Sequence, residues 1–338
     1  EGFPGTQEAK NALIGIRNIY VDKGDASTYF EYASKLGSIA NMSLAEKDSL
    51  TYMAAEKLYV NGDCDKSNLA FTQYLKDFPQ GSFAINSNYY LGDCYYRSNN
   101  TDAAIEAFSR VAAMPKNSFT EQSLLQLGKI YFSKEEYQKC FDTYNKLEQI
   151  AELKTSLLDA RLGKLRCAFL LKDYANMPAI ANSVLSTEKL PTEIETETRF
   201  KLAKTLLELN KVDDALIEFA KVAANLKTKE GAESKYQIAK IYLDKGEYSK
   251  AETEVFAFSE KNTPHQYWLA KSFILLADVY MKQDDFFQAK ATLQSVIDGY
   301  STTNDGIIDE ATGKLNQLVK AEKDKQTKEV DDINIGVK

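Results

Sequence analysis

The sequence predicts an all-α protein built from helical hairpins that follow one another along the chain. Pairs of small residues, twelve positions apart, recur at an almost constant interval of 36 to 38 residues. Apolar side chains stand three and four positions from these residues, a spacing that places them on one face of a helix. The 338 residues include only 16 Gly and 6 Pro, which suits helices with few irregular segments.

The paired small residues mark the places where the two helices of each hairpin cross. Gly, Ala, Ser or Cys at a crossing lets the helix axes approach to the near end of the usual range of about 8–10 Å. Short polar turns such as SKEE, DKGE and KQDD separate the two helices. The pairs are Ala55 and Ser67, Gly92 and Ala104, Gly128 and Cys140, a weaker pair Leu165 and Met177, Ala203 and Ala215, Ala239 and Ala251, and Ala277 and Ala289.

A single hairpin leaves one face uncovered, so each hairpin must stack on the next. We expect a degenerate hairpin over residues 1–47, seven hairpins over residues 48–300 and a capping helix over residues 301–330. Residues 331–338 are expected to form a flexible tail. The capping helix has one apolar face, formed by Ile308, Ala311, Leu315 and Leu318.

The first residues repeat a feature found between two hairpins. Phe3-Pro4 has the layout of Phe78-Pro79, which closes one hairpin and leads into the next. We therefore expect upstream repeats before Glu1, in a longer array whose own hairpins are partners of this chain.

Charge and composition exclude several classes of function. The formal net charge is −7, so the surplus of Lys and Arg that neutralises phosphates is missing and we expect no nucleic-acid partner. No apolar run approaches the roughly 18–20 residues of a membrane span. The sequence has no GxSxG, no HExxH and no glycine-rich phosphate loop, so we expect neither an enzyme nor a cofactor.

The cysteines and the one histidine lie too far apart in the sequence for a zinc site, so we expect no metal. Each cysteine falls within a helical apolar pattern. We interpret all four as small core residues, because free cysteine is among the most buried residue types. The residues concerned are Cys64, Cys94, Cys140, Cys167 and His265.

Two stretches resemble the tetratricopeptide repeat. YYLGDCYYRSNNTDAAIEAF, residues 89–108, contains the L-G-x2-Y and A-x3-F of that family. LQLGKIYFSKEEYQKCFDTY, residues 125–144, contains the same pattern with Cys140 in place of Ala. The resemblance implies a right-handed superhelical solenoid of about eight hairpins. It also implies that the first helix of each hairpin lines a concave groove, where a protein partner binds as an extended peptide or a helix.

The resemblance selects the side chains that face this groove. Most are aromatic or apolar at one level of the helix and charged at the next. The candidates for partner binding are Tyr52, Glu56, Tyr59, Tyr89, Asp93, Tyr96, Arg97, Lys129, Phe132, Arg166, Phe169, Phe200, Lys204, Tyr236 and Lys240.

At one level of the first helices the charges change sign along the chain, from two acids to four bases and then one acid. The residues are Glu56, Asp93, Lys129, Arg166, Lys204, Lys240 and Asp278. One interpretation is that these charges only keep the surface soluble. The other is that Lys129, Arg166, Lys204 and Lys240 form a basic stripe that attracts an acidic segment of a partner. The tyrosines likewise either pack between hairpins or anchor a peptide.

The stretch FPQGSFAINSNYYLGDCYY, residues 78–96, is similar to repeats of bacterial cell-envelope proteins. The families concerned are the outer-membrane assembly lipoproteins and the coordinator of the Tol-Pal system. This resemblance favours a periplasmic or membrane-attached scaffold in envelope assembly. A cytoplasmic regulator, a secretion chaperone and a structural spacer of a larger solenoid are the alternatives.

Overall fold

The structure of the protein, a computed structural model, describes residues 6–335 and the side chains of residues 6–37 and 40–321. Over residues 6–335 the only regular elements are helices, which confirms the all-α fold class. The chain divides into two compact units, Glu1–Leu171 and Lys172–Lys338, and each is described by itself. Phe3-Pro4, and with it the prediction of a hairpin upstream, lies outside the described residues.

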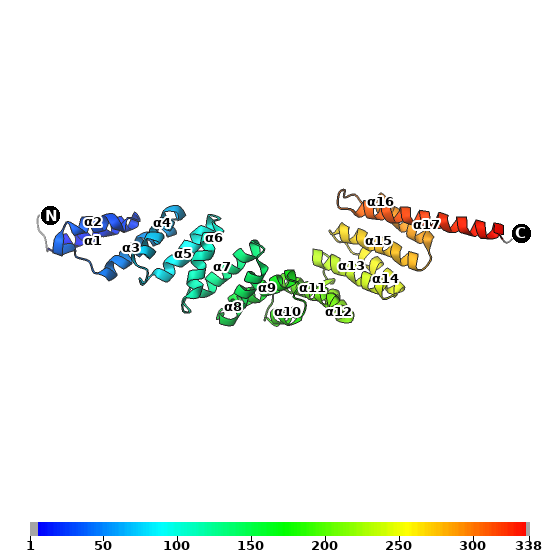
Figure 1. Cartoon of the computed structure of the whole chain (residues 1–338), viewed down its shortest axis with the longest axis horizontal. Helices are drawn as coiled ribbons and strands as arrows, with labels where there is room; N and C mark the ends of the chain where they lie inside the picture. Colours follow the sequence, from blue (N-terminus) through cyan, green and yellow to red (C-terminus); the bar gives the residue numbers. More distant parts are fainter. Residues whose placement is uncertain (1–5, 336–338) are drawn as a thin grey trace. The chain divides into compact units, whose positions relative to one another are not determined.

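Unit 1 is a stack of helical hairpins (Figure 1). Helices α1 and α2 form its first hairpin, and α3–α4, α5–α6 and α7–α8 form the next three, followed by α9. The bounds are α1 Gln7–Asp22, α2 Ala26–Ser34, a 3₁₀ turn η1 Gly37–Ala40, α3 Leu44–Val60, α4 Cys64–Asp77, α5 Ala84–Arg97, α6 Thr101–Ala113, α7 Thr120–Ser133, α8 Tyr137–Ile150 and α9 Lys154–Leu170.

Unit 2 begins with α10, so the predicted hairpin around Leu165 and Met177 spans the division between the units. Its remaining helices pair as α11–α12, α13–α14 and α15–α16, with α17 last. The bounds are α10 Met177–Leu185, α11 Thr192–Glu208, α12 Val212–Val222, α13 Lys229–Asp244, α14 Tyr248–Ser259, α15 Gln266–Lys282, α16 Phe286–Gly299 and α17 Ile307–Ile335.

One residue in the left-handed region of the backbone lies in each turn that joins the two helices of a hairpin. This conformation ends the first helix and reverses the chain. Glycine adopts it without strain at Gly62 and Gly246, whereas Asn99, Glu135, Asn210 and Asp284 adopt it with a Cβ atom. The turns therefore recur with the same period as the small residues.

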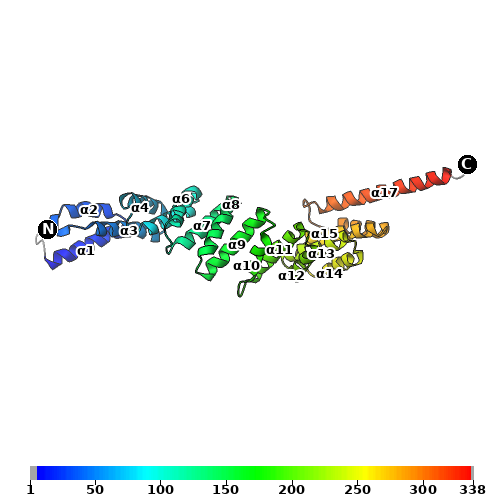
Figure 2. The ribbon, with the colours of Figure 1, turned by 60° about the horizontal axis from the view of Figure 1, so that its bottom comes forward.

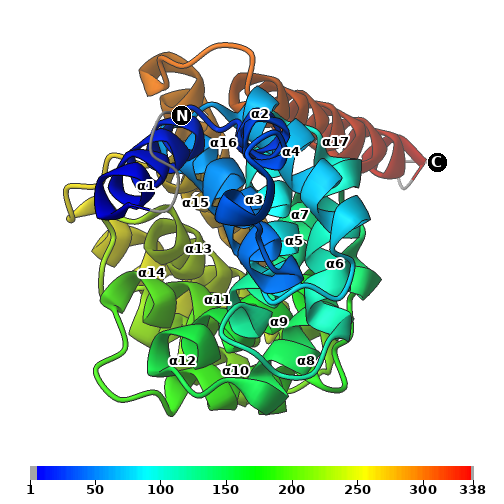
Figure 3. The ribbon, with the colours of Figure 1, turned by 90° about the vertical axis from the view of Figure 1, so that its left-hand side faces the viewer.

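The small residues lie at the crossings of the helices, as predicted. Ala55, Ser67 and Ala104 in unit 1 are fully buried, as are the six predicted small residues of unit 2 from Ala203 to Ala289. A Cβ atom on Gly92 would lie 2.9 Å from the ring of Phe108, which is also fully buried. Figure 3 shows the first helices α3, α5 and α7 of unit 1 on one side of the stack and the second helices α4, α6 and α8 on the other.

Helix α17 packs against α15 and α16 at the end of unit 2. Ile307, Ala311 and Leu318 are buried there, and Lys271 of α15 forms an ion pair of 2.8 Å with Glu310. The helix begins six residues after the predicted start of the cap and continues to Ile335, into the segment predicted to be a flexible tail. Figure 2 shows α17 running on past the end of α15.

The four cysteines form two disulfides, Cys64 with Cys94 and Cys140 with Cys167. Each joins the second helix of one hairpin to the first helix of the next. The interpretation as core residues is correct for Cys94, Cys140 and Cys167, which are fully buried, but it did not include the pairing. The partners are 30 and 27 residues apart in sequence, and only the stacking of hairpins brings their Cα atoms to 5.3 and 6.5 Å. Closing loops of this length stabilises a fold by about 3–4 kcal/mol each.

Candidate partner-binding groove

Aromatic residues of the first helices stack on rings that stand just before or at the start of the next first helix. Tyr52 stacks on Phe83 with 4.2 Å between ring centroids, and Tyr89 stacks on Phe119 at 4.5 Å. In unit 2 the ring of Tyr236 lies 5.4 Å from that of Trp268 and is tilted against it. Tyr52 is only 4% exposed. These three predicted groove tyrosines therefore pack between hairpins.

The hydroxyl groups of two groove tyrosines are also used within unit 1. The Tyr59 hydroxyl donates to Asp93 at 2.8 Å and accepts from the Arg97 guanidinium at 3.1 Å. Arg97 and Asp93 form an ion pair of 2.6 Å, so α3 and α5 are joined through three predicted groove residues. Burial, followed by the bond to Asp93, raises the pKa of Tyr59 well above its ordinary value.

Tyr52, two turns earlier on α3, is also bonded to a carboxylate, here one of its own helix. Its hydroxyl donates to Glu56 at 2.5 Å and accepts from the Asn86 amide at 3.4 Å. Burial and the bond to Glu56 raise the pKa of Tyr52 far above its ordinary value. Tyr96, in contrast, is 39% exposed on the same surface. Over α3 and α5 the acidic candidates are thus bound to groups of their own chain.

A pocket of about 230 Å³ opens between α7 and α9 of unit 1. Lys129 and Phe132 of α7 and Arg166 of α9, all predicted groove residues, line it. Leu125, Leu162, Gly163, Tyr144 and Asp159 complete its lining. The structure therefore brings three of the fifteen candidates together around one cavity.

Tyr144 of α8 reaches this pocket because two glycines make room for its ring. A Cβ atom on Gly128 would lie 2.5 Å from the ring, and a Cβ atom on Gly163 would also overlap it. The ring is 6% exposed and part of the hydrophobic core of unit 1. Burial, and secondarily the charge of Asp159, raise the pKa of Tyr144 to about 12, so its hydroxyl is a hydrogen-bond donor at neutral pH.

The pocket combines an apolar floor with a rim of mixed charge. Lys129 is exposed, and none of the described acidic side chains forms an ion pair with it. Arg166 and Asp159 lie on the facing helix. Lys129, Arg166 and Asp159 are thus the charged residues among those that line the pocket.

The predicted bases of unit 2 are paired with acids of their own unit. Lys204 forms an ion pair of 3.0 Å with Glu233 and lies over the ring of Phe200, with 5.3 Å from its Nζ atom to the centroid. Lys240 forms an ion pair of 2.8 Å with Asp244. Phe169 in unit 1 is half-buried. The four bases thus differ in setting, and Lys129 and Arg166 are the two that share a pocket.

Sequence reasoning missed the acids that face these bases. Asp159 and Glu233 each stand six residues before the first small residue of their hairpin, and each lies near the base of the preceding hairpin. Aligning the hairpins at that position would have found both acids. The stacking rings Phe83, Phe119 and Trp268 were missed in the same way, nine residues before the small residue.

Over the described side chains, no group of three or more His, Cys, Asp or Glu could hold a metal ion. Within the part of the chain that the structure describes, no helix is both long and apolar enough to cross a bilayer.

The fold and this groove define an all-α protein of stacked helical hairpins. Residues 52–118 of unit 1 and residues 266–303 of unit 2 each match the tetratricopeptide repeat. Each unit therefore contains a segment that matches this repeat. Such repeats are protein-binding scaffolds in general.

Solved structures that match the chain include a tetratricopeptide repeat protein from Parabacteroides merdae, with 14% identity, a TM-score of 0.43, and coverage of 80% of this chain and 98% of that one. A thermophilic TPR protein of Thermus thermophilus has 17% identity and a TM-score of 0.31, covering 58% of this chain and 99% of its own. The match to yeast Tom70 has 14% identity and a TM-score of 0.42, and it covers 88% of this chain and 61% of that chain. No curated protein matches the sequence.

Proposed function

We propose that this chain is a non-enzymatic scaffold that binds a partner protein along the first helices of its hairpins, and that the pocket between α7 and α9 receives an acidic side chain of that partner. The observation that supports this most is that Lys129, Arg166 and Tyr144 line one cavity. A carboxylate there would gain two cationic neighbours and one donor. Phe132 and Leu162 offer apolar contact to the residues on either side of it.

The binding test uses short labelled peptides of alternating Leu and Glu, with Leu and Gln peptides of equal length as the neutral control. The acidic peptide is expected to bind in low salt and to weaken as salt is added, because the attraction is between exposed charges. Fluorescence anisotropy measures both. Equal affinity for the acidic and neutral peptides would contradict the proposal.

The two disulfides support a periplasmic or membrane-attached setting, in which the scaffold takes part in envelope assembly. Disulfides persist in oxidising compartments and are rare in the cytosol. A cytoplasmic regulator or secretion chaperone is the weaker alternative for the same reason. The test is the state of the cysteines after rapid alkylation in intact cells of the native source: disulfides at both pairs support an oxidising compartment, and four free thiols contradict it.

A structural spacer is the second candidate, and one observation favours it. Over α3 and α5 the polar groups of the groove form hydrogen bonds with one another, Tyr52 with Glu56 and Tyr59 with Asp93. These groups therefore have hydrogen-bond partners without any bound protein. A spacer would bind neither peptide, whereas a scaffold would bind the acidic one.

A further inference from the structure

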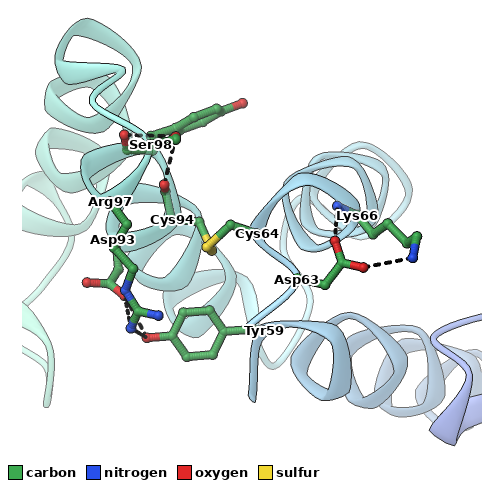
Figure 4. Close-up of a disulfide and its surroundings, with 9 residues drawn as sticks. Tyr59, Asp63, Cys64, Lys66, Asp93, Cys94, Arg97 and Ser98 are labelled. Atoms are coloured by element: carbon green, nitrogen blue, oxygen red, sulfur yellow. Dashed lines mark hydrogen bonds and ion pairs between the residues drawn. A yellow bond between two sulfur atoms is a disulfide. The ribbon is translucent and has the colours of Figure 1, made fainter. Parts of the chain in front are cut away.

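The two disulfides of unit 1 differ in how far solvent reaches them. Cys94, Cys140 and Cys167 are fully buried, whereas Cys64 is partly exposed. Cys64 is the first residue of α4, at the surface end of the hairpin turn, while Cys94 lies inside α5. Figure 4 shows the bond between these two helices.

We propose that Cys64 is a site of thiol–disulfide exchange, at which a small thiol or a dithiol reductant opens the Cys64–Cys94 bond while the folded protein keeps Cys140–Cys167 closed. Exchange requires a thiolate to approach a disulfide sulfur in line with the bond, so access selects the sulfur that is attacked. Only the Cys64 side of this bond has solvent next to it.

The exchange requires only the reductant thiol and the Cys64–Cys94 disulfide. The thiolate of the reductant attacks Cys64 Sγ and forms a mixed disulfide with it. The Cys64–Cys94 bond breaks, and Cys94 Sγ leaves with the electron pair as a thiolate that takes a proton from water. The second thiol of a dithiol then displaces Cys64, so the protein disulfide is reduced and the dithiol is oxidised.

The carboxylates around Cys64 are either paired with a cation or exposed to solvent. Asp63 and Asp65 flank Cys64 in the sequence, and Asp65 is exposed, where solvent and salt screen its charge. Asp63 accepts from the Lys66 ammonium at 2.8 Å and from the Lys66 backbone N–H at 3.1 Å. Figure 4 shows this pair on the side of α4 that faces away from the sulfur atoms. Asp93, the other neighbour, is paired with Arg97.

The hairpins remain packed when this bond opens. Phe71 and Tyr74 of α4 and Leu91 of α5 are buried in one cluster with Tyr52 and Ala55, and none of these contacts depends on sulfur. Cys140 and Cys167, in contrast, belong to the core cluster that contains Phe108, Tyr144 and Leu147. A reductant reaches that bond only when this core opens.

The test exposes the oxidised full chain to dithiothreitol under native conditions, traps thiols with N-ethylmaleimide at successive times and maps the labelled cysteines by mass spectrometry. Cys64 and Cys94 are expected to become labelled on the order of 100-fold sooner than Cys140 and Cys167, because the second pair waits for an opening of the core. Simultaneous labelling of all four cysteines, or earlier labelling of Cys140 and Cys167, would overturn the proposal.

A second measurement identifies the attacked sulfur. Glutathione disulfide is expected to modify Cys64 in a Cys94→Ser variant and to leave Cys94 unmodified in a Cys64→Ser variant, with circular dichroism to check that both are folded. Equal modification of Cys94 would contradict the assignment. If either variant fails to fold, the mapping of the unaltered protein decides alone.

Discussion

The Tyr59 hydroxyl donates a hydrogen bond of 2.8 Å to Asp93, which lies 34 residues further along the chain. The bond joins α3 to α5 and places a phenol, a carboxylate and the Arg97 guanidinium together on one surface. Replacing Tyr59 by Phe is expected to destabilise unit 1 by about 1 kcal/mol, because Asp93 retains Arg97 as its partner. Urea unfolding followed by circular dichroism measures the change. Tyr96→Phe, at an exposed ring of α5, is the control, and an equal loss in both variants would contradict this role for Tyr59.

Gly128 leaves room for the ring of Tyr144. Gly128→Ala is expected to destabilise unit 1 by about 1–3 kcal/mol, since the new methyl group would lie 2.5 Å from the ring. Gly15→Ala in α1 is the control, because a Cβ atom there meets nothing within 4 Å and alanine favours a helix interior. Gly15→Ala should therefore be neutral or stabilising. The explanation fails if the two substitutions have the same effect in thermal unfolding.

Glu135 holds a left-handed backbone conformation, with φ of 59°, in the turn between α7 and α8. Glu135→Gly is expected to stabilise unit 1 by up to about 1 kcal/mol, because glycine adopts this conformation without the Cβ penalty. Asp65→Gly in the first turn of α4 should instead destabilise, since it places glycine in a helix. A lower melting temperature for Glu135→Gly would show that the side chain contributes more than its backbone strain costs.

Glu148 of α8 makes unit 1 sensitive to acid. Burial raises the pKa of Glu148, but its ion pairs with Lys164 at 2.7 Å and Arg161 at 3.1 Å outweigh burial and keep the pKa below the ordinary value of 4.5. The folded state thus favours the charged form. The stabilisation is complete above about pH 4.5 and is lost as the pH falls below it. Glu148→Gln should reduce this loss in unfolding measured from neutral to acid pH, whereas Glu135→Gln should not; parallel curves for Glu148→Gln and the unaltered protein would contradict the assignment.

The sequence predicts those parts of the fold that each hairpin determines for itself. The small residues at the crossings and the polar turns recur in register, because each is fixed by the geometry of one hairpin. The contacts between hairpins were harder to predict. The partner of Cys64 and the ring that covers Tyr52 depend on how one hairpin stacks on the next, and no single repeat contains that information.

The same distinction between one hairpin and the stacking of hairpins applies to the candidate site. Which residues line the first helices follows from the repeat, and Lys129, Phe132 and Arg166 do meet at one pocket. Whether a charge on that surface is available for a partner depends on the neighbouring hairpin. Glu233 pairs with Lys204 because it enters from the next first helix, and Tyr59 binds Asp93 for the same reason.

The most direct measurement of the proposed function is an exchange of charges across the α7–α9 pocket. Lys129→Glu combined with Arg166→Glu should slow association of the Leu and Glu peptide by about tenfold or more in low salt, because steering by opposite charge is lost. The same variant should gain affinity for a Leu and Lys peptide of equal length. Lys76→Glu with Lys146→Glu, on exposed positions of α4 and α8, changes the net charge equally and should leave both peptides almost unaffected. An equal response of the two double variants would contradict the proposed pocket.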